Sequence, residues 1–274
     1  MAEAARGVDY STRPSDWGLF FDKLKAKGYT VLGRYLYDFE DPKRVTVKEL
    51  EAAWKRGFKV FFWFETSEAA ALQGYDRGSS HAERALGELS RLGLPETTPV
   101  YYCVDFDASL YQLSNAVRNY FRGVRSIVPL AQVGVYGGYR AVKFLSEEGL
   151  VRYVAQTEAW SYLNGLWPTP PVWYPGAQIH QWTVRGPGSI GGVQCDGLDI
   201  VDDCGAYSPN EEATDVLTDL DREAIYYGCV RALSNQFDIA ILEAKFEGNA
   251  ARVKELEAKK AIDVAADRKR YGLA

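Results

Sequence analysis

The sequence has few of the residues on which several classes of protein depend. Its 274 residues include only two histidines and four cysteines, without a C-x-x-C spacing, so we expect no metal site and no cofactor. Lys and Arg number 32 against 37 Asp and Glu, giving a formal net charge of −5, which argues against a nucleic-acid partner. No window approaches the roughly 20 apolar residues of a membrane-spanning helix, so we expect no membrane partner.

Two kinds of motif are also missing. The sequence contains neither the G-x-S-x-G turn of serine hydrolases nor a phosphate-binding glycine loop. The first six residues run directly into Gly7-Val8-Asp9-Tyr10 without the apolar stretch of a signal peptide. We therefore expect a chain that is made in the cytoplasm and keeps its cysteines as buried thiols.

The first two-thirds of the sequence alternates short apolar runs with amphipathic segments. Eight apolar runs predict strands at residues 6–9, 30–37, 59–64, 100–105, 132–136, 153–159, 177–182 and 197–201. Apolar residues three or four apart predict helices at 16–27, 46–56, 79–92, 112–128 and 139–148. Strands that alternate with helices form parallel sheets. The pattern predicts an α/β fold, a (β/α)8 TIM-like barrel.

The end of the predicted barrel and the end of the chain depart from this pattern. After Tyr153 the helical signal fades, because residues 163–176 are rich in Pro, Trp and Gly and residues 185–192 are rich in Gly. From Glu211 the composition turns to Ala, Glu, Lys, Asp and Leu with heptad-like spacing. We predict a barrel over residues 1–208, irregular in its last third. A helical tail over 211–274 would serve packing, homo-oligomerisation or partner binding.

Carboxylates gather at the predicted strand ends, where barrels of this type bind their ligands. Asp9 closes the first strand, Glu65 follows the third, and Asp105 and Asp107 close the fourth. Asp196 lies near the eighth strand, which neighbours the first strand when a barrel closes. We therefore expect these five carboxylates to converge at the barrel mouth.

Asp105 and Asp107 are two residues apart, and alternate side chains of a strand share a face. Two carboxyls crowded in one pocket raise the pKa of one of them, which can then act as a general acid beside an ionised neighbour. That pairing suits cleavage of a glycosidic bond. The alternative is that an Asp-x-Asp after a strand caps the following helix or binds a cation.

Several short motifs occur in the order found in a known family. They are Gly7-Val8-Asp9-Tyr10-Ser11, Val104-Asp105-Phe106-Asp107, Gly134-Val135-Tyr136, Ala159-Trp160-Ser161-Tyr162, His180-Gln181-Trp182-Thr183 and Asp196-Gly197. In this order they resemble motifs of the family 25 lysozymes. With Gly33-Arg34-Tyr35 added, residues 5–208 most resemble a glycoside-hydrolase-like domain family, the domain of unknown function 1906, found in actinobacterial proteins and phage lysins.

The resemblance implies roles for individual residues. Asp9 and Asp105 match acidic positions of the lysozyme site, and Asp196 or Asp199 matches the acidic residue near the last strand. Asp107 takes the position of the proton-donating Glu of the family. Since Asp is one methylene shorter than Glu, and a general acid must reach the leaving oxygen, this substitution bears on the activity itself.

The Asp at position 107 leaves three possibilities: the substrate lies deeper, Glu65 has taken the acid role, or activity has been lost. A carboxyl among Phe62, Trp63 and Phe64 would have a raised pKa if it were buried. A solvated Glu65 would instead cap the next helix.

Other side chains could bind sugar rings by stacking and hydrogen bonding. These candidates are Arg34, Tyr35, Tyr136, Trp160, Gln181, Trp182 and Asp199. Core packing is an alternative role for each aromatic residue, and Arg34 could instead form a structural ion pair with an acid.

Together these observations predict a lysozyme-type glycoside hydrolase that cleaves the glycan strands of bacterial peptidoglycan. Asp105 and Asp107 would be the central acid and stabilising carboxylate, supported by Asp9, Glu65 and Asp196. Action at the cell wall would follow lysis-type release, as for a phage endolysin, or a place in a virion tail. The alternative is a catalytically inactive glycan-binding barrel, or a structural virion component whose helical tail binds its partner.

Overall fold

The computed structural model describes residues 5–37, 41–161, 171–183, 186–209 and 254–261. The chain divides into two compact units, residues 1–213 and 214–274. In the second unit the described residues form one helix, 254–261, and the remainder of the expected helical tail lies outside the described residues. None of the described helices is long and apolar enough to cross a membrane.

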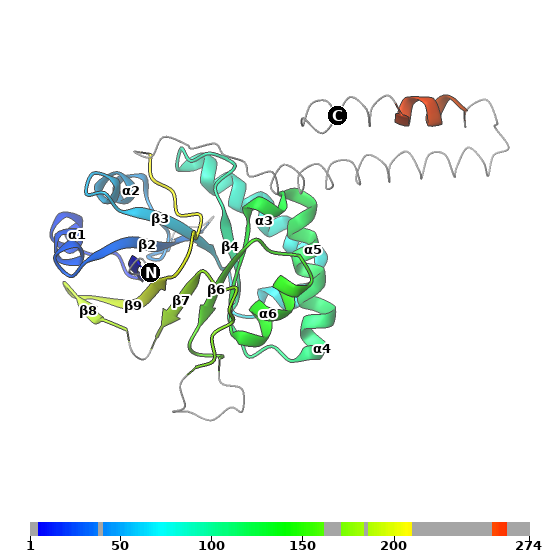
Figure 1. Ribbon diagram of the computed structural model, residues 1–274. Coiled ribbons are helices and arrows are strands. Elements are labelled where there is room, and N and C mark those ends of the chain that lie inside the picture. Colours follow the sequence, from blue (N-terminus) through cyan, green and yellow to red (C-terminus); the bar gives the residue numbers. More distant parts are fainter. Residues whose placement is uncertain (1–4, 38–40, 162–170, 184–185, 210–253, 262–274) are drawn as a thin grey trace. The chain divides into compact units, whose positions relative to one another are not determined.

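A closed eight-stranded barrel forms the centre of the first unit (Figure 1), which confirms the fold expected from the sequence. Its seven parallel strands follow one another in chain order: β1 (Ala5–Asp9), β2 (Tyr29–Leu36), β3 (Lys59–Phe64), β4 (Val100–Val104), β5 (Val133–Gly137), β6 (Tyr153–Thr157) and β7 (Ile179–Trp182). The eighth strand of the ring, β9 (Val193–Ile200), lies between β7 and β1 and runs antiparallel to both. A short strand, β8 (Gly188–Ile190), pairs with β9 as a hairpin.

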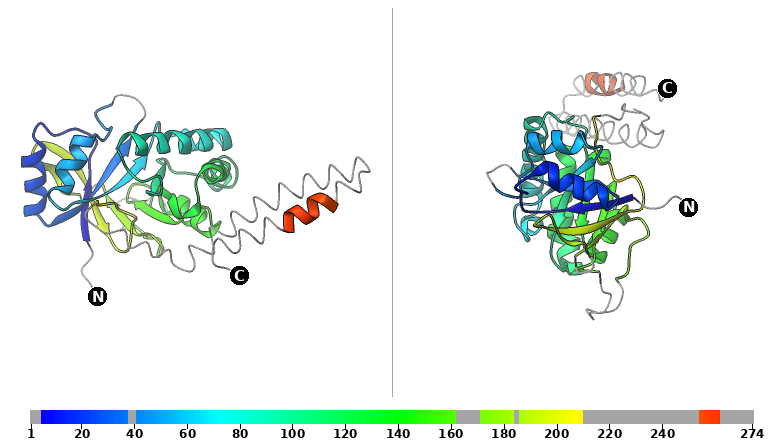
Figure 2. Two further views of the ribbon diagram at one scale, coloured as in Figure 1. Left: turned by 90° about the horizontal axis from the view of Figure 1, so that it is seen from above. Right: turned by 90° about the vertical axis from the view of Figure 1, so that its left-hand side faces the viewer.

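Helices surround the parallel part of the barrel (Figures 1 and 2). They are α1 (Trp17–Ala26), α2 (Val47–Trp54), α3 (Tyr75–Arg91), α4 (Leu110–Gln112), α5 (Arg118–Ile127) and α6 (Tyr139–Glu147), with the short turns η1 (Ala70–Gln73), η2 (Leu113–Val117) and η3 (Leu130–Gln132). Between Tyr153 and Pro209 the described residues contain no helix, in agreement with the irregular last third expected from the sequence. Of the described helices, α1 packs against β8 and the start of β9, through Phe20, Ile190 and Val193.

The interior of the barrel is packed with side chains and leaves no pore. Its core includes Phe61, Trp63 and Tyr101, all at most 1% exposed. Gly33 on β2 makes room for them, because a Cβ there would lie 2.7 Å from Cζ of Phe61 and 2.9 Å from Nε1 of Trp63. These rings fill the interior of the barrel beside Gly33.

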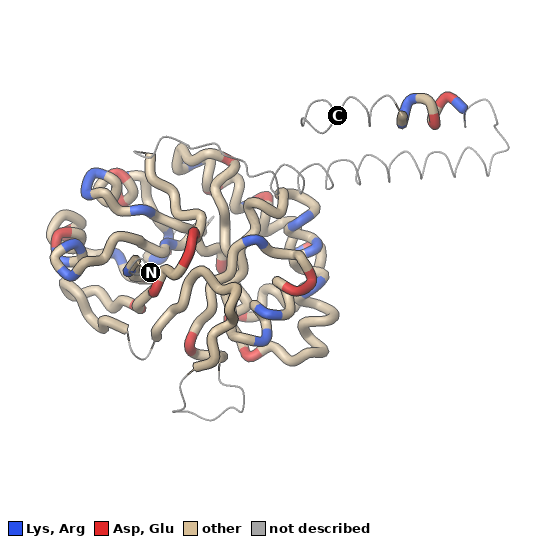
Figure 3. The backbone as a smooth tube through the Cα atoms, in the orientation of Figure 1, with Lys and Arg blue, Asp and Glu red and all other residues tan. Residues whose placement is uncertain are grey.

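Basic and acidic residues are interspersed over the helices around the barrel (Figure 3). The distribution agrees with the net charge of −5.

Candidate active site

Asp9 and Asp196 form the centre of the mouth of the barrel. Asp9 ends β1 and is the register partner of Asp196 on the antiparallel strand β9, so the two side chains project from the same face of the sheet. Burial, and then the charge of Asp196, raise the pKa of Asp9 to about 8, while burial raises the pKa of Asp196 to about 6. Between these values the pair holds one proton.

Gln181 on β7 fixes the orientation of Asp9. Its amide Nε2 donates a hydrogen bond of 2.6 Å to Oδ2 of Asp9, and the Tyr136 hydroxyl donates one of 2.8 Å to Oε1 of Gln181. The three residues come from β1, β7 and β5, so the chain of hydrogen bonds crosses the interior of the barrel. Because Tyr136 holds the Gln181 amide in place, the hydrogen bond from Gln181 holds the carboxyl of Asp9 in one geometry.

Asp105 directly follows β4 and lies at the same end of the barrel. Burial raises its pKa, and a hydrogen bond from Trp160 opposes this shift. The indole Nε1 of Trp160 donates to Oδ1 of Asp105 at 3.4 Å. Trp160 packs directly on Gly138, where a Cβ would lie 2.2 Å from the Cβ of Trp160. The partly exposed indole is thus fixed at the rim of the mouth, with one edge toward a carboxylate.

Glu65 follows β3 and forms an ion pair with Lys43, whose Nζ lies 3.3 Å from Oε2 of the carboxylate. Burial raises the pKa of Glu65; Lys43 opposes this shift, and the charges of Asp105 and Glu68 add to it. The Glu65 side chain is 11% exposed. Glu65 therefore combines partial desolvation, a neighbouring carboxylate and access to solvent.

Tyr35 on β2 lies among these charged groups. Burial raises the pKa of its hydroxyl well above the usual value, and the charges of Asp9 and Glu65 add to the shift. Nζ of Lys43 lies 5.1 Å from the centre of its ring. The Tyr35 hydroxyl therefore stays neutral, and it lies close enough to both Asp9 and Glu65 to be affected by their charges.

Asp107 does not share the surroundings of Asp105. The strand β4 ends at Val104, so Asp105 and Asp107 follow it in a loop, and the alternation of side chains along a strand does not hold them on one face. The Asp107 side chain is 58% exposed and forms an ion pair with Arg140 of α6. Asp105 and Asp107, which the sequence pattern placed side by side, therefore contact different residues: Asp105 binds Trp160, and Asp107 binds Arg140.

Arg34 lies outside the mouth as well. Its guanidinium is 0% exposed and forms a buried ion pair with Glu49 of α2. It also donates to the backbone oxygens of Tyr10 and Lys43 and stacks on the ring of Tyr10, 4.1 Å from the centroid. Arg34 therefore holds β2 to α2 and to the loop that carries Lys43, instead of contacting a ligand.

Trp182 and Asp199 lie on the outer face of the barrel, with the Trp182 indole Nε1 donating to Oδ2 of Asp199 at 2.6 Å. The expected place of Asp199 beside the mouth fails for a geometric reason. Because β9 is antiparallel, Asp199 pairs with Arg6 near the start of β1, whereas Asp196 pairs with Asp9 at its end. An odd separation of three residues also turns the Asp199 side chain to the opposite face of the sheet.

Two charged residues of the mouth were missed from the sequence, Lys43 and Glu68. Lys43 opposes the rise in pKa of Asp9, Glu65 and Asp105, and Glu68 adds to the rise for the last two. Both residues occur in loops after strands, β2 and β3. That position on the ligand-binding face of a barrel is the signal by which they could have been found.

The mouth gathers carboxylates suited to proton transfer. Within the part of the chain that the structure describes, no three His, Cys, Asp or Glu side chains are arranged to hold a metal ion. Carboxyls with raised pKa values are among the groups that glycosidic bond cleavage uses. The fold and this site together define a glycoside hydrolase-like barrel.

The model of the Rv2525c-like, glycoside hydrolase-like domain family matches residues 22–203, and the chain belongs to this family. The resemblance inferred from the order of the sequence motifs is thereby confirmed.

Relatives at the sequence level cover parts of the chain. YbfG of Bacillus subtilis, an uncharacterised protein, is 31% identical over 187 residues, which make up 61% of this chain and 25% of YbfG. Rv2525c of Mycobacterium tuberculosis, named as a candidate peptidoglycan hydrolase, is 24% identical over 158 residues, 56% of this chain and 62% of that protein. The chain thus spans a quarter of the length of YbfG and under two-thirds of Rv2525c.

Solved structures agree with the barrel. The crystal structure of the Tat-secreted protein Rv2525c in complex with L-tartrate has a TM-score of 0.63 at 23% identity and covers 74% of this chain and 99% of that chain. An uncharacterised protein of B. stearothermophilus has a TM-score of 0.51 at 16% identity and covers 74% of this chain and 100% of its own. At these identities the likeness establishes the fold alone.

Proposed function

We propose that this protein is a glycoside hydrolase that cleaves the glycan strands of bacterial peptidoglycan with carboxylates at the barrel mouth. The observation that carries the proposal is the raised pKa of Asp9, Asp196, Glu65 and Asp105, with burial as the largest cause for each. A raised pKa keeps a carboxyl protonated closer to neutral pH, as a general acid must be. Membership of a glycoside hydrolase-like family and the name of Rv2525c support this substrate class.

In this proposal Glu65 donates the proton to the leaving oxygen, and Asp105 is the ionised carboxylate. Burial raises the pKa of Glu65, Lys43 opposes this shift, and the charge of Asp105 adds to it, so an ionised Asp105 favours a proton on Glu65. Asp105 then stabilises the oxocarbenium-like centre or activates water. This assignment replaces Asp107, whose carboxylate is engaged by Arg140, with a residue that is one methylene longer and lies in the mouth.

The remaining polar groups of the mouth would bind the sugar. Asp9 and Asp196, together with Gln181 and Tyr136, offer hydrogen-bond donors and acceptors on one side. The partly exposed indole of Trp160 offers an apolar face at the rim.

The release of reducing ends from purified peptidoglycan tests the proposal. We expect Glu65→Gln and Asp105→Asn each to lower the rate by about a hundredfold or more, since a positioned acid or base contributes that much. Glu147→Gln and Asp22→Asn are matched controls, because both carboxylates are exposed and paired with surface cations, Lys143 and Arg56. A wild-type chain that releases no reducing ends would exclude hydrolysis, and full activity of Glu65→Gln would move the donor role elsewhere.

A glycan-binding barrel without hydrolysis is the second candidate. It is favoured by one observation, the ion pair between Arg140 and Asp107 at the position that the family resemblance assigns to the proton donor. In that case the protein would pellet with purified cell walls without releasing reducing ends. Release by lysis and a place in a virion stay predictions. A homo-oligomeric or virion contact through residues 211–274 falls mainly on residues that the structure does not describe.

A further inference from the structure

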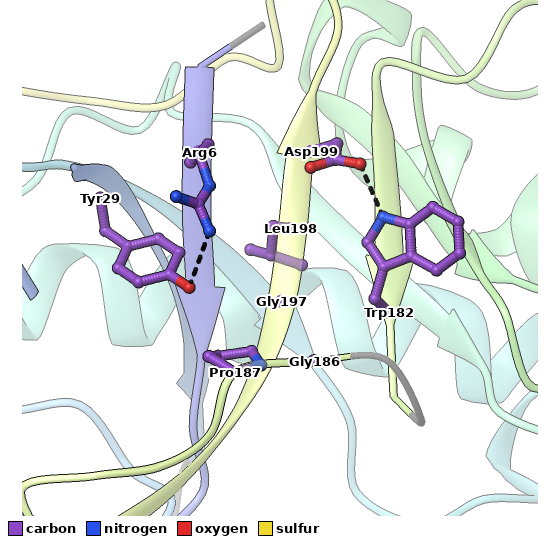
Figure 4. A pocket seen from close by; sticks show the side chains of 8 residues that line it. All are labelled: Arg6, Tyr29, Trp182, Gly186, Pro187, Gly197, Leu198 and Asp199. Atoms are coloured by element: carbon purple, nitrogen blue, oxygen red, sulfur yellow. Dashed lines mark hydrogen bonds between the residues drawn. The ribbon is translucent and has the colours of Figure 1, made fainter. Parts of the chain in front are cut away.

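A second pocket lies on the outer face of the barrel, away from the carboxylates of the mouth. It has a volume of about 270 Å³ and is formed by β1, β2, β7, β9 and the segment before β8 (Figure 4). Its lining consists of Arg6, Tyr29, Trp182, Gly186, Pro187, Gly197, Leu198 and Asp199. No described helix follows α6 in the barrel unit.

Arg6 supplies a positive charge on one side of the pocket. Its Nη1 donates to the backbone oxygen of Lys27 and its Nη2 to the hydroxyl of Tyr29, both at 3.2 Å. The guanidinium also stacks on the Tyr29 ring, 4.7 Å from its centroid. These contacts orient the side chain; its register partner on β9 is Asp199, and no carboxylate of the described residues lies within ion-pair distance of Arg6. Its remaining N–H groups can bind an anion.

Asp199 lies on β9 as the register partner of Arg6, and Trp182 lies on β7, on the other side of β9 from Arg6 (Figure 4). The hydrogen bond of 2.6 Å between Trp182 and Asp199 and the edge-on contact of Trp173, 4.9 Å between ring centroids, fix the indole plane. Oδ2 of Asp199 accepts the indole proton, which leaves Oδ1 to accept from a hydroxyl or amide of a ligand. This side therefore combines an aromatic ring with a hydrogen-bond acceptor.

Two glycines, Gly186 and Gly197, let the segment before β8 pack closely on β9. Gly197 contributes no side chain, and a Cβ there would approach Cδ of Pro187 to 3.1 Å. Gly186 crosses just above it, where a Cβ would lie 2.6 Å from the backbone oxygen of Trp182. The segment Gly186–Pro187 therefore packs directly on Gly197 and bounds the pocket at this end, so a ligand is left the space between Arg6, Asp199 and Trp182.

We propose that this outer pocket binds a single carboxylated sugar ring. A cation for the carboxylate, an acceptor for ring hydroxyls or an amide and an aromatic ring for the C–H face are the three groups that such a ligand requires. The volume of about 270 Å³ lies just below the range of small-molecule pockets, roughly 300–1,000 Å³, which suits one ring better than a chain. The carboxylate belongs to an ether-linked acid on an amino sugar or to a uronic acid. A second site of this kind would hold the protein on an acidic wall polymer independently of hydrolysis at the mouth.

The indole N–H signal of Trp182 in the ¹⁵N-labelled 274-residue chain reports on this pocket, and Trp182→Phe identifies it by its absence. We expect N-acetylmuramic acid or glucuronic acid to shift this signal. N-acetylglucosamine lacks the carboxylate and lactate lacks the sugar ring, so each should bind at least about tenfold more weakly. A stronger response to one of the two acidic sugars identifies the source of the carboxylate.

Arg6→Gln should weaken the acidic sugar by about tenfold, and Asp199→Asn tests the opposite side with the Trp182 signal still present. Arg122→Gln, at an exposed arginine of α5, is the matched control and should change nothing. The proposal is overturned if N-acetylglucosamine shifts the signal equally, if Arg6→Gln binds like the wild type, or if no sugar shifts it. Glu65→Gln should retain the response, which separates a failure of this proposal from a failure of hydrolysis at the mouth.

Discussion

Asp9 and Asp196 face each other across the antiparallel pair of β1 and β9, and together they hold one proton near neutral pH. The cause is burial combined with the repulsion between the two carboxylates. A buried carboxyl that keeps its proton makes the stability of the fold depend on pH, and the direction of that dependence follows from the sign of the pKa shift.

Asp9→Asn should stabilise the protein at pH 8. The pKa of Asp9 is about 8 in the folded protein against an ordinary value of 3.8, so the folded state binds more protons between these values and wild-type stability falls as pH rises through that range. We expect the substitution to raise the free energy of unfolding at pH 8 by on the order of 2 kcal/mol, with the gain fading toward pH 4. Urea unfolding at several pH values measures this, with Asp22→Asn as the exposed control. A loss of stability at every pH would contradict the assignment.

Lys43→Met should move the pH profile of hydrolysis upward. Lys43 holds down the pKa of Glu65 and Asp105, so removing its charge raises both. Because its side chain is 36% exposed, solvent screens the effect, and we expect a shift of roughly half a pH unit to one unit on both limbs of the profile. Lys48→Met, at an exposed position of α2, should leave the profile in place. An unchanged profile for Lys43→Met would remove Lys43 from the electrostatics of the reaction.

Asp107→Asn should leave hydrolysis within about twofold of the wild type, since Asp107 is no part of the proposed Glu65 and Asp105 pair. The ion pair with Arg140 is exposed on both sides, so its loss should cost at most about 1 kcal/mol of unfolding free energy. Rates of reducing-end release and urea unfolding measure the two effects. A hundredfold loss of rate would return Asp107 to the role that the family resemblance assigns to it.

Arg34→Met should destabilise the fold without a specific effect on glycan binding. Removal of the guanidinium leaves the Glu49 carboxylate buried without its cation, and breaking a buried pair in this way costs about 3–5 kcal/mol. The double variant Arg34→Met with Glu49→Leu should recover much of this loss. Chemical unfolding and the KM for soluble glycan fragments are the two measurements. A raised KM in a variant of normal stability would instead indicate contact between Arg34 and the substrate.

The sequence predicts the barrel and much of its mouth because both depend on local patterns. Apolar runs place β1 to β7 within a few residues of their observed bounds, and the ends of these strands meet at one face. Closure of a barrel then brings the last strand beside the first, as Asp196 and Asp9 show. Gln181 and Tyr136 follow from the same rule, because both lie near the ends of predicted strands.

What the sequence does not predict depends on the direction of a strand and on contacts between distant side chains. The segment 188–200 forms a hairpin, so β9 runs antiparallel and carries Asp199 toward the far end of the barrel. Asp107 forms its ion pair with Arg140, which lies on α6, after the next strand β5. Lys43 reaches the mouth from a loop, and no periodicity marks such a residue.

The hydrogen bond from Gln181 to Asp9 joins residues 172 positions apart, and β9 reaches β1 only when the ring closes. Contacts of such long range form late, because the intervening chain must be ordered before they repay the entropy of closing the loop. The pair of Asp9 and Asp196 is therefore absent from every partly folded form in which β9 is detached from β1. During synthesis the mouth stays without its proton-sharing pair until the strand β9 has emerged, so its assembly coincides with completion of the barrel.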